Sequence, residues 1–194
     1  MLALPPAPAP ARPRLTFVGT AVAGTALLMM VGGMLAAYLA VRDAAGGTTA
    51  AWLPEGAVIP EVAANIMLVT VLACSITAQW AVWSMHRGDR AGASLALTLT
   101  ALFGLALINA QAYIWVEMEL PLADAQFNTL FYAVTGTFVA LVIAAIVMAA
   151  ITAFRSLAGR YSTKDTEGIA ANALAWHLLT VAFAAIWFVV YVIK

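Results

Sequence analysis

The sequence predicts an all-α, polytopic membrane protein, a bundle of five transmembrane helices, from three observations. The apolar fraction is 64% and the charged fraction is 9%, against about 45–50% and about 25% in soluble domains. Five segments each reach the roughly 20 apolar residues that a helix needs to cross the hydrocarbon core. Their apolar runs are continuous and not alternating, which excludes the strands of a membrane barrel. The predicted spans are residues 15–41, 62–85, 91–116, 125–154 and 168–193.

These spans occupy most of the chain, so the sequence predicts a single transmembrane domain over residues 15–194. Residues 1–14, MLALPPAPAPARPR, are rich in proline and alanine and predict a disordered cytoplasmic tail. The first apolar run is much longer than the about 7–15 residues of a signal-peptide core. We therefore expect the first span to remain as a helix.

The distribution of basic residues predicts the orientation in the membrane. Cytoplasmic segments carry the excess of lysine and arginine. Seven of the nine basic residues lie before the first span, between the second and third, or between the fourth and fifth: Arg12, Arg14, Arg87, Arg90, Arg155, Arg160 and Lys164. The N-terminus is therefore predicted to be cytoplasmic and the C-terminus to lie outside.

The connection over residues 42–61 is the longest on the outside. Gly46-Gly47 and Pro54 predict irregular structure there, and Trp52 is expected at the membrane interface. The predicted N-cap residues of the fourth and fifth spans are Asp124 and either Asp165 or Thr166. The aromatic residues predicted as interfacial anchors at span ends are Trp83, Trp115, Trp187 and Tyr191.

His177 is the one ionisable side chain predicted at membrane depth. A haem b site would need two histidines at one depth on facing helices, and the only other histidine, His86, lies about 14 Å away along the bundle at 1.5 Å per residue. No carboxylate is available at depth to complete a metal site. The sequence therefore predicts no catalytic, cofactor-binding or metal-ligating residue, and Cys74 is expected to pack as a small side chain.

Seven other polar side chains lie at predicted membrane depth, and we expect most of them to form hydrogen bonds between helices. A neutral imidazole has one donor and one acceptor, so His177 is predicted to donate to one helix and accept from another. An intramembrane serine protease would use Ser75 beside His177, but no glycine-rich serine motif surrounds it. A channel or transporter would instead need a continuous polar path. The seven residues are Asn65, Ser75, Thr77, Gln79, Asn109, Gln111 and Thr135.

Several short patterns resemble the cytochrome c oxidase subunit III family in its short five-helix form. The last span carries Trp176-His177, then aromatic residues and a basic residue at Lys194, which is similar to the ending of that family. The other patterns, in chain order, are Tyr38 with Arg42, Arg87-Gly88-Asp89, Gly104 with Gln111 and Trp115, and Phe131-Tyr132 with Thr135-Gly136. The resemblance covers about residues 15–194.

The chain also departs from that family at five positions. The family's intramembrane glutamate is replaced by Leu27, and the glutamate of its Gln-x-x-Glu pattern by Ile114. Two histidines are replaced near Phe138 and Leu141, and an aspartate by Thr180. The resemblance therefore implies a scaffold role that does not use a buried carboxylate.

The resemblance implies a non-catalytic accessory subunit in a bacterial cytoplasmic membrane. Such a subunit packs on catalytic subunit I and other oxidase subunits, binds phospholipids, and supports assembly, stability and proton uptake, while haem and copper lie in the partner subunits. No nucleic-acid partner is expected. Alternatives are a subunit III-like paralogue in a related reductase or assembly role, and an autonomous transporter or channel. The candidate structural, lipid or interface contacts are Tyr38, Arg42, Arg87, Gln111, Trp115, Trp176 and His177.

Overall fold

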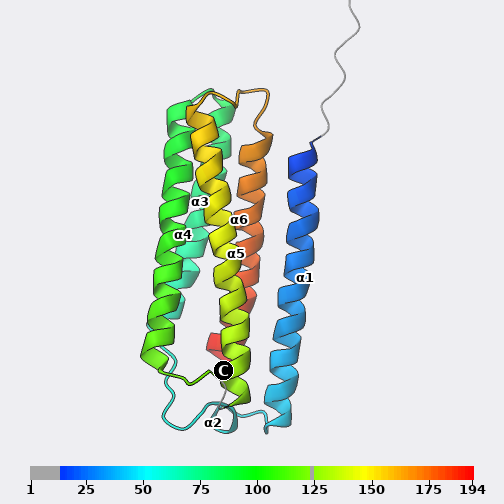
Figure 1. Ribbon diagram of the computed structural model, residues 1–194, viewed down its shortest axis with the longest axis vertical. Coiled ribbons are helices and arrows are strands. Elements are labelled where there is room, and N and C mark those ends of the chain that lie inside the picture. The colour runs from blue at the N-terminus through cyan, green and yellow to red at the C-terminus, as the bar shows by residue number, and fades with distance from the viewer. Residues whose placement is uncertain (1–13, 123–124) are drawn as a thin grey trace, which may run out of the picture.

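The computed structural model describes residues 14–122 and 125–194. Within these residues, five helical segments are long and apolar enough to cross a membrane (Figure 1). They are α1 (Leu15–Ala44), α3 (Glu61–His86), α4 (Arg90–Met118), α5 (Gln126–Leu157) and α6 (Glu167–Ile186) with its π-helical continuation η1 (Trp187–Ile193). The all-α fold class and the five spans are confirmed, and each predicted boundary lies within a few residues of the observed one. The predicted tail, apart from residue 14, and the predicted N-cap Asp124 lie outside the described residues.

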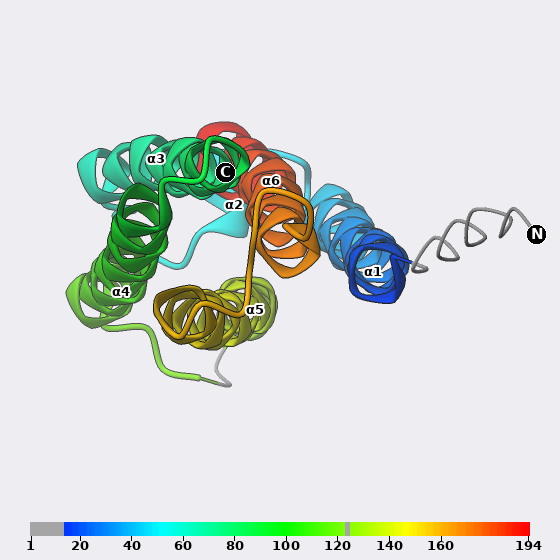
Figure 2. The same cartoon turned by 90° about the horizontal axis from the view of Figure 1, so that it is seen from above.

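The helices run side by side and alternate in direction. Seen along the bundle, α3, α4 and α5 lie in sequence around one side of α6, and α1 packs mainly against the other side of α6 (Figure 2). The largest fully buried side chains are aromatic and include Trp176, Phe138 and Phe183. The rings of Phe138 and Phe183 are 4.7 Å apart and join α5 to α6. We call the end of the bundle at which α3 ends and α4 begins the basic end, because it carries Arg87 and Arg90.

Local sequence signals set the turn at the basic end. Gly88 follows α3 with φ +80°, a left-handed conformation that glycine adopts at no steric cost. The Asp89 carboxylate then accepts a 2.8 Å hydrogen bond from the Gly92 backbone N–H and caps α4. The next cap at this end is weaker, because Thr166 occupies the predicted N-cap position of α6 without a side-chain hydrogen bond.

The long connection at the opposite end contains a short helix, α2 (Thr49–Trp52). The Thr48 side chain accepts a 3.3 Å hydrogen bond from the Ala51 N–H and caps α2. Trp52 is only 5% exposed. The prediction of irregular structure therefore holds at Gly46-Gly47 and Pro54 and is wrong for Thr49–Trp52. The prediction of an interfacial Trp52 is wrong, because its side chain is buried within the chain. The chain reverses at Gly46 and Gly47, both with positive φ, and this reversal lets α2 fold back over the end of the bundle.

Candidate functional site

The seven residues predicted as contacts lie in three places along the bundle and do not form one site. Four of them lie near the α2 end, two lie near the middle of α6, and Arg87 lies at the basic end. The four near α2 are Tyr38, Arg42, Gln111 and Trp115. Their contact role with lipid or another subunit remains a prediction, and the structure instead shows what each contacts within the chain.

A chain of aromatic rings crosses the bundle near α2. The Tyr38 ring lies 5.3 Å from Trp52 and 6.4 Å from Phe127, both edge-to-face. Phe127 stacks on Phe131 at 5.6 Å, and Phe131 meets Tyr191 at 6.3 Å. These spacings are those of favourable aromatic pairs. We call these five residues the aromatic cluster, and they connect α1, α2, α5 and η1.

Two predicted residues on α4 form hydrogen bonds near this cluster, and one of them bonds to a member of it. The Tyr191 hydroxyl donates a 3.2 Å bond to Gln111 Oε1 inside the bundle. The Trp115 indole N–H donates a 3.0 Å bond to Thr135 Oγ1 on α5. Tyr191 is 3% exposed, so its prediction as an interfacial anchor is wrong. The π-helical turn that contains Tyr191 is a local widening of a helix, of the kind often found at functional sites.

Arg42 joins the last turn of α1 to the end of η1. Its Nε donates a 2.7 Å hydrogen bond to the Lys194 backbone oxygen, and Nη2 donates a 3.3 Å bond to the Ile193 carbonyl. The Lys194 ammonium in turn pairs with the Glu61 carboxylate at the start of α3. Cations at a helix C-terminus interact favourably with its exposed carbonyl groups. Arg42 therefore stabilises the meeting point of α1, α3 and η1.

His177 forms a hydrogen-bonded row with two side chains of α3. Its Nδ1 contacts Ser75 Oγ, and its Nε2 lies 3.1 Å from Gln79 Oε1. Because Gln79 presents an oxygen, Nε2 donates, and Nδ1 accepts the Ser75 hydroxyl proton. The prediction that His177 joins two different helices is wrong, since both partners lie one turn apart on α3. The pair Ser75 and Gln79 instead fixes α6 against a single neighbour.

The Ser75–His177 contact does not have the order of groups found in a catalytic triad. In such a triad a carboxylate orients the imidazole and stabilises its charged form. Here the second imidazole nitrogen faces the neutral amide of Gln79, which offers no charge compensation. The geometry therefore favours a structural bond between α3 and α6 over nucleophilic catalysis.

Two further hydrogen bonds between the described helices form separate pairs. Trp187 Nε1 donates to Asn65 Oδ1 at 2.9 Å, and the hydroxyls of Thr77 and Thr100 lie 2.8 Å apart. Bonds of this kind between membrane helices contribute about 0.6 kcal/mol on average. This scattered arrangement, within residues 14–122 and 125–194, favours helix packing over a polar path for transport. Over the same residues, no group of three or more His, Cys, Asp or Glu side chains is placed to hold a metal ion.

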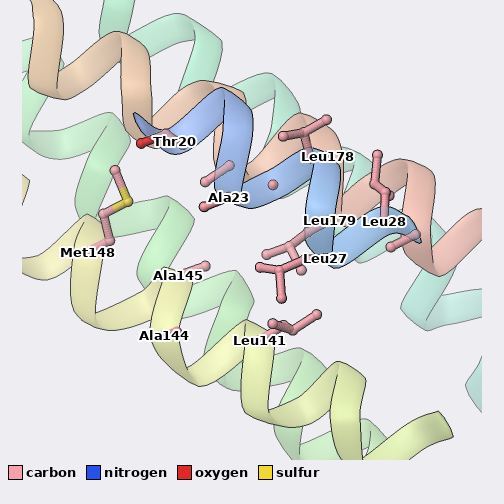
Figure 3. A pocket seen from close by; sticks show the side chains of 13 residues that line it. Thr20, Ala23, Leu27, Leu28, Leu141, Ala144, Ala145, Met148, Leu178 and Leu179 are labelled. Carbon is pink, nitrogen blue, oxygen red and sulfur yellow. The ribbon is translucent and has the colours of Figure 1, made fainter. Parts of the chain in front are cut away.

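An apolar cavity of about 230 Å³ lies between α1 and α5, and α6 forms its third wall (Figure 3). Its wall on α1 includes Gly24 and Leu27, and its wall on α5 includes Leu141, Ala144 and Met148. Leu27 and Leu141 are two of the positions at or near which the resemblance noted above implies that ionisable residues are replaced. The structure thus brings these two positions to one cavity. The side chains of Leu27, Leu141 and Met148 present only aliphatic and thioether groups to it.

Trp176 and Arg87 have packing and stacking contacts within the chain. The Trp176 ring is fully buried and lies beside Gly104, where an added Cβ would come within 2.9 Å of its Cη2. The Arg87 guanidinium lies over the Trp83 ring with Cζ 3.6 Å from the ring centroid, the geometry of a cation–π pair.

The sequence did not identify Trp52 as an internal contact, because its position in a glycine- and alanine-rich connection gives no sign of burial.

Comparison with known proteins accounts for this architecture. The sequence pattern of the family described as cytochrome c oxidase subunit III matches residues 25–194. The chain is 26% identical over 186 residues to a protein of Mycobacterium leprae named probable cytochrome c oxidase subunit 3, an alignment that covers 94% of this chain and 90% of the relative. It is 27% identical over 187 residues to cytochrome c oxidase subunit 3 of Corynebacterium diphtheriae, with the same coverage. The chain therefore belongs to the cytochrome c oxidase subunit III family.

Proposed function

We propose that this chain is a non-catalytic accessory subunit of a respiratory haem-copper oxidase in a bacterial cytoplasmic membrane. The observation that carries the proposal is the family match over residues 25–194, together with bacterial relatives named cytochrome c oxidase subunit 3. In this proposal the basic end faces the cytoplasm, in line with the excess of basic residues in the segments at that end. The subunit would pack on the catalytic subunit, which would hold the haem and copper.

The internal chemistry of the bundle supports a scaffold role. The hydrogen bonds of His177, Asn65 and Gln111 each join two helices of the same chain. Such bonds determine which helix faces meet, but they offer neither a redox centre nor a charged group that could exchange protons across the membrane. The contribution to aerobic electron transport would therefore be assembly and stability of the complex.

The cavity between α1 and α5 supports a second part of the proposal, which is the binding of phospholipid. Its apolar lining would accept an acyl chain without leaving a polar group unpaired. Because Leu27 and Leu141 stand where the family more often has ionisable groups, this chain would support proton uptake by ordering lipid and neighbouring subunits. It would not do so through a carboxylate of its own in this cavity.

Affinity purification of the tagged chain from its native membrane in a mild detergent tests the proposal. We expect a large haem-containing membrane subunit to co-purify in a constant ratio, together with phospholipid, and we expect deletion of the gene to lower the amount of assembled oxidase. Recovery with a different reductase, or with assembly factors alone, would instead support the paralogue role. Haem or copper bound in a constant ratio to the isolated chain would refute the non-catalytic assignment.

A further inference from the structure

One outward face of α3 combines exposed apolar residues with two carboxamides. Successive members are four or three residues apart, so they share one side of the helix. Ile76, near the centre of this face, is 69% exposed. The six residues, all exposed, are Asn65, Val69, Leu72, Ile76, Gln79 and Trp83.

The adjoining residues of α6 extend this surface. Val181 and Phe188 are exposed on α6 and its continuation η1; Val181 lies one turn after His177, and Phe188 directly follows Trp187. The hydrogen bond from His177 to Gln79 and that from Trp187 to Asn65 join the two helices at two levels. The surface formed by the six α3 residues with His177, Val181 and Phe188 is therefore continuous, and we call it the α3–α6 face.

The Gln79 amide lies within the hydrocarbon region if the bundle spans a membrane. It lies seven residues from His86, about 10 Å along a helix that is about 39 Å long at 1.5 Å per residue. Its oxygen accepts from His177, and in the part of the chain that the structure describes no hydrogen bond uses its nitrogen. That nitrogen has two N–H donors, and a polar group left unpaired in hydrocarbon is costly.

The outward face of α5 shows what a lipid-facing surface of this chain looks like. It lies on the other side of the bundle from α3 (Figure 2). Its exposed residues at comparable depth have only apolar side chains: Ala133, Ala140, Ile143, Val147 and Ile151. Both faces are exposed to a similar degree, but only the face on α3 contains amides. Contact with lipid therefore explains the purely apolar composition of the α5 face. It does not explain why the face on α3 carries the Gln79 amide.

We infer that the α3–α6 face docks a transmembrane helix of the catalytic oxidase subunit, which presents a hydrogen-bond acceptor opposite Gln79. A backbone carbonyl or the oxygen of a hydroxyl or carboxamide side chain has the required chemistry, since Gln79 offers only donors there. Val62–Trp83 contains no charged residue, so this part of α3 offers no counterion to a charge on the partner helix. The spacing of four and three residues suits the left-handed packing of neighbouring helices. This inference rests on the proposed function, and it adds the face and the chemistry of the contact.

Photo-crosslinking in the native membrane tests the docked face. A photoreactive phenylalanine analogue replaces Ile76 in one variant of the full chain and Val147 in a matched control. The two sites are comparable, because each lies ten residues before the end of its helix at the basic end and Val147 is 52% exposed. We expect Ile76 to crosslink to a transmembrane segment of the catalytic subunit and Val147 to crosslink to lipid.

The other outcomes separate this inference from the function on which it rests. Lipid adducts alone at Ile76, with the catalytic subunit still co-purifying, would overturn the docked face and leave the proposed function intact. A crosslink at Ile76 to a second copy of this chain would overturn the choice of partner. If no oxidase subunit co-purifies from the unmodified strain, the proposed function fails first and the inference fails with it.

A substitution at Gln79 tests the hydrogen bond itself. We expect Gln79→Leu to lower the fraction of catalytic subunit retained during detergent washing by about threefold, the effect of one average hydrogen bond between membrane helices. Ser75→Ala is the matched control, because it removes the other bond of His177 and leaves the Gln79 amide in place. Equal retention in Gln79→Leu and the unmodified chain, or an equal loss in both variants, would overturn the role of Gln79 at the interface.

Discussion

The indole N–H of Trp52 donates a 2.8 Å hydrogen bond to the hydroxyl of Tyr38 inside the bundle. This bond ties α2 to α1, whose apolar core has the smallest buried share among the five membrane-length helices. The other buried residues of α1 are Val31 and Leu35. The inner face of α1 is therefore anchored near α2, whereas nearer the basic end the cavity separates α1 from α5.

We expect Tyr38→Phe to destabilise the attachment of α1. The substitution leaves the buried Trp52 N–H without its acceptor, and an unpaired buried donor costs about 1–3 kcal/mol. The free energy of unfolding in detergent should fall by this amount, and proteolysis at the Gly46-Gly47 turn should become faster. Tyr113→Phe is the control, since that tyrosine is 53% exposed on α4. Equal stability of the Tyr38 and Tyr113 variants would contradict the importance of the bond.

Gly104 allows α4 to approach both α5 and α6. A Cβ at this position would lie 2.6 Å from Ile146 Cγ1 and 2.9 Å from Trp176 Cη2. We expect Gly104→Ala to lower the free energy of unfolding by about 1–3 kcal/mol, the usual cost of overpacking a core. Denaturation of the purified chain in mixed micelles would measure this change.

Gly136→Ala on α5 provides the matched control for that prediction. Apart from the adjacent residues and the backbone of its own helical turns, no atom lies within 4 Å of a Cβ added there, so the substitution should only remove the unfavourable helix propensity of glycine. We expect Gly136→Ala to be neutral or to stabilise by up to about 1 kcal/mol. If both alanine variants changed stability in the same direction and by the same amount, close packing at Gly104 would not be the cause.

The spans could be predicted from the sequence because the hydrocarbon thickness sets a minimum helix length and penalises charge. That constraint is local and applies to each segment separately, so the boundaries agree within a few residues. The burial of Trp52 could not be predicted in this way. It depends on where the Gly46-Gly47 turn directs α2, and on Tyr38, which lies 14 residues earlier in the chain.

The partners of His177 show the same limit at the candidate site. The sequence identifies His177 as the one ionisable group at depth and Ser75 and Gln79 as polar groups at depth. It does not show that Ser75 and Gln79, four residues apart, point to the same neighbouring helix. Nor does it show that each of them forms a hydrogen bond with one nitrogen of the His177 imidazole. The rotation of α3 about its axis determines this pairing, and small apolar side chains on every face leave that rotation undetermined in the sequence.

His177→Ala should weaken the association of α3 with α6 without removing a chromophore. Loss of the bonds to Ser75 and Gln79 should lower the stability of the assembled subunit by about 0.6–1.7 kcal/mol, the range found for hydrogen bonds between membrane helices. Visible absorption of the purified complex should keep every haem band at its original position. If a haem band is lost when the absorption is compared at equal amounts of assembled complex, His177 ligates a metal. That result would contradict the structural role of the hydrogen-bonded row of Ser75, His177 and Gln79.

The pH dependence of stability should carry a contribution from Tyr161, which lies between α5 and α6 at the basic end. Burial raises the pKa of its phenol, and the nearby Arg155 guanidinium partly opposes this shift. Because the pKa is higher in the folded state, the contribution to stability is complete below the unfolded pKa of about 10. It is lost as the pH rises through the folded pKa.

Tyr161→Phe isolates this contribution from those of the other tyrosines. We expect the free energy of unfolding in detergent to fall less steeply above about pH 10 in Tyr161→Phe than in the unmodified chain. Below about pH 9 the two proteins should have parallel profiles. Parallel profiles above about pH 10 as well would show that the pKa of the Tyr161 phenol does not differ between the folded and unfolded states.

Filling the cavity between α1 and α5 should displace lipid from the subunit. Ala144 lines the cavity, so Ala144→Phe would place a ring where the proposed acyl chain lies. We expect fewer phospholipid molecules to remain bound in native mass spectrometry after mild delipidation. Val147→Phe, three residues later on the outward side of α5, adds the same ring outside the cavity and should leave the retained lipid unchanged. If the two variants retained equal amounts of lipid, the tightly held molecules would lie elsewhere on the bundle, since only the first variant changes the volume between the helices.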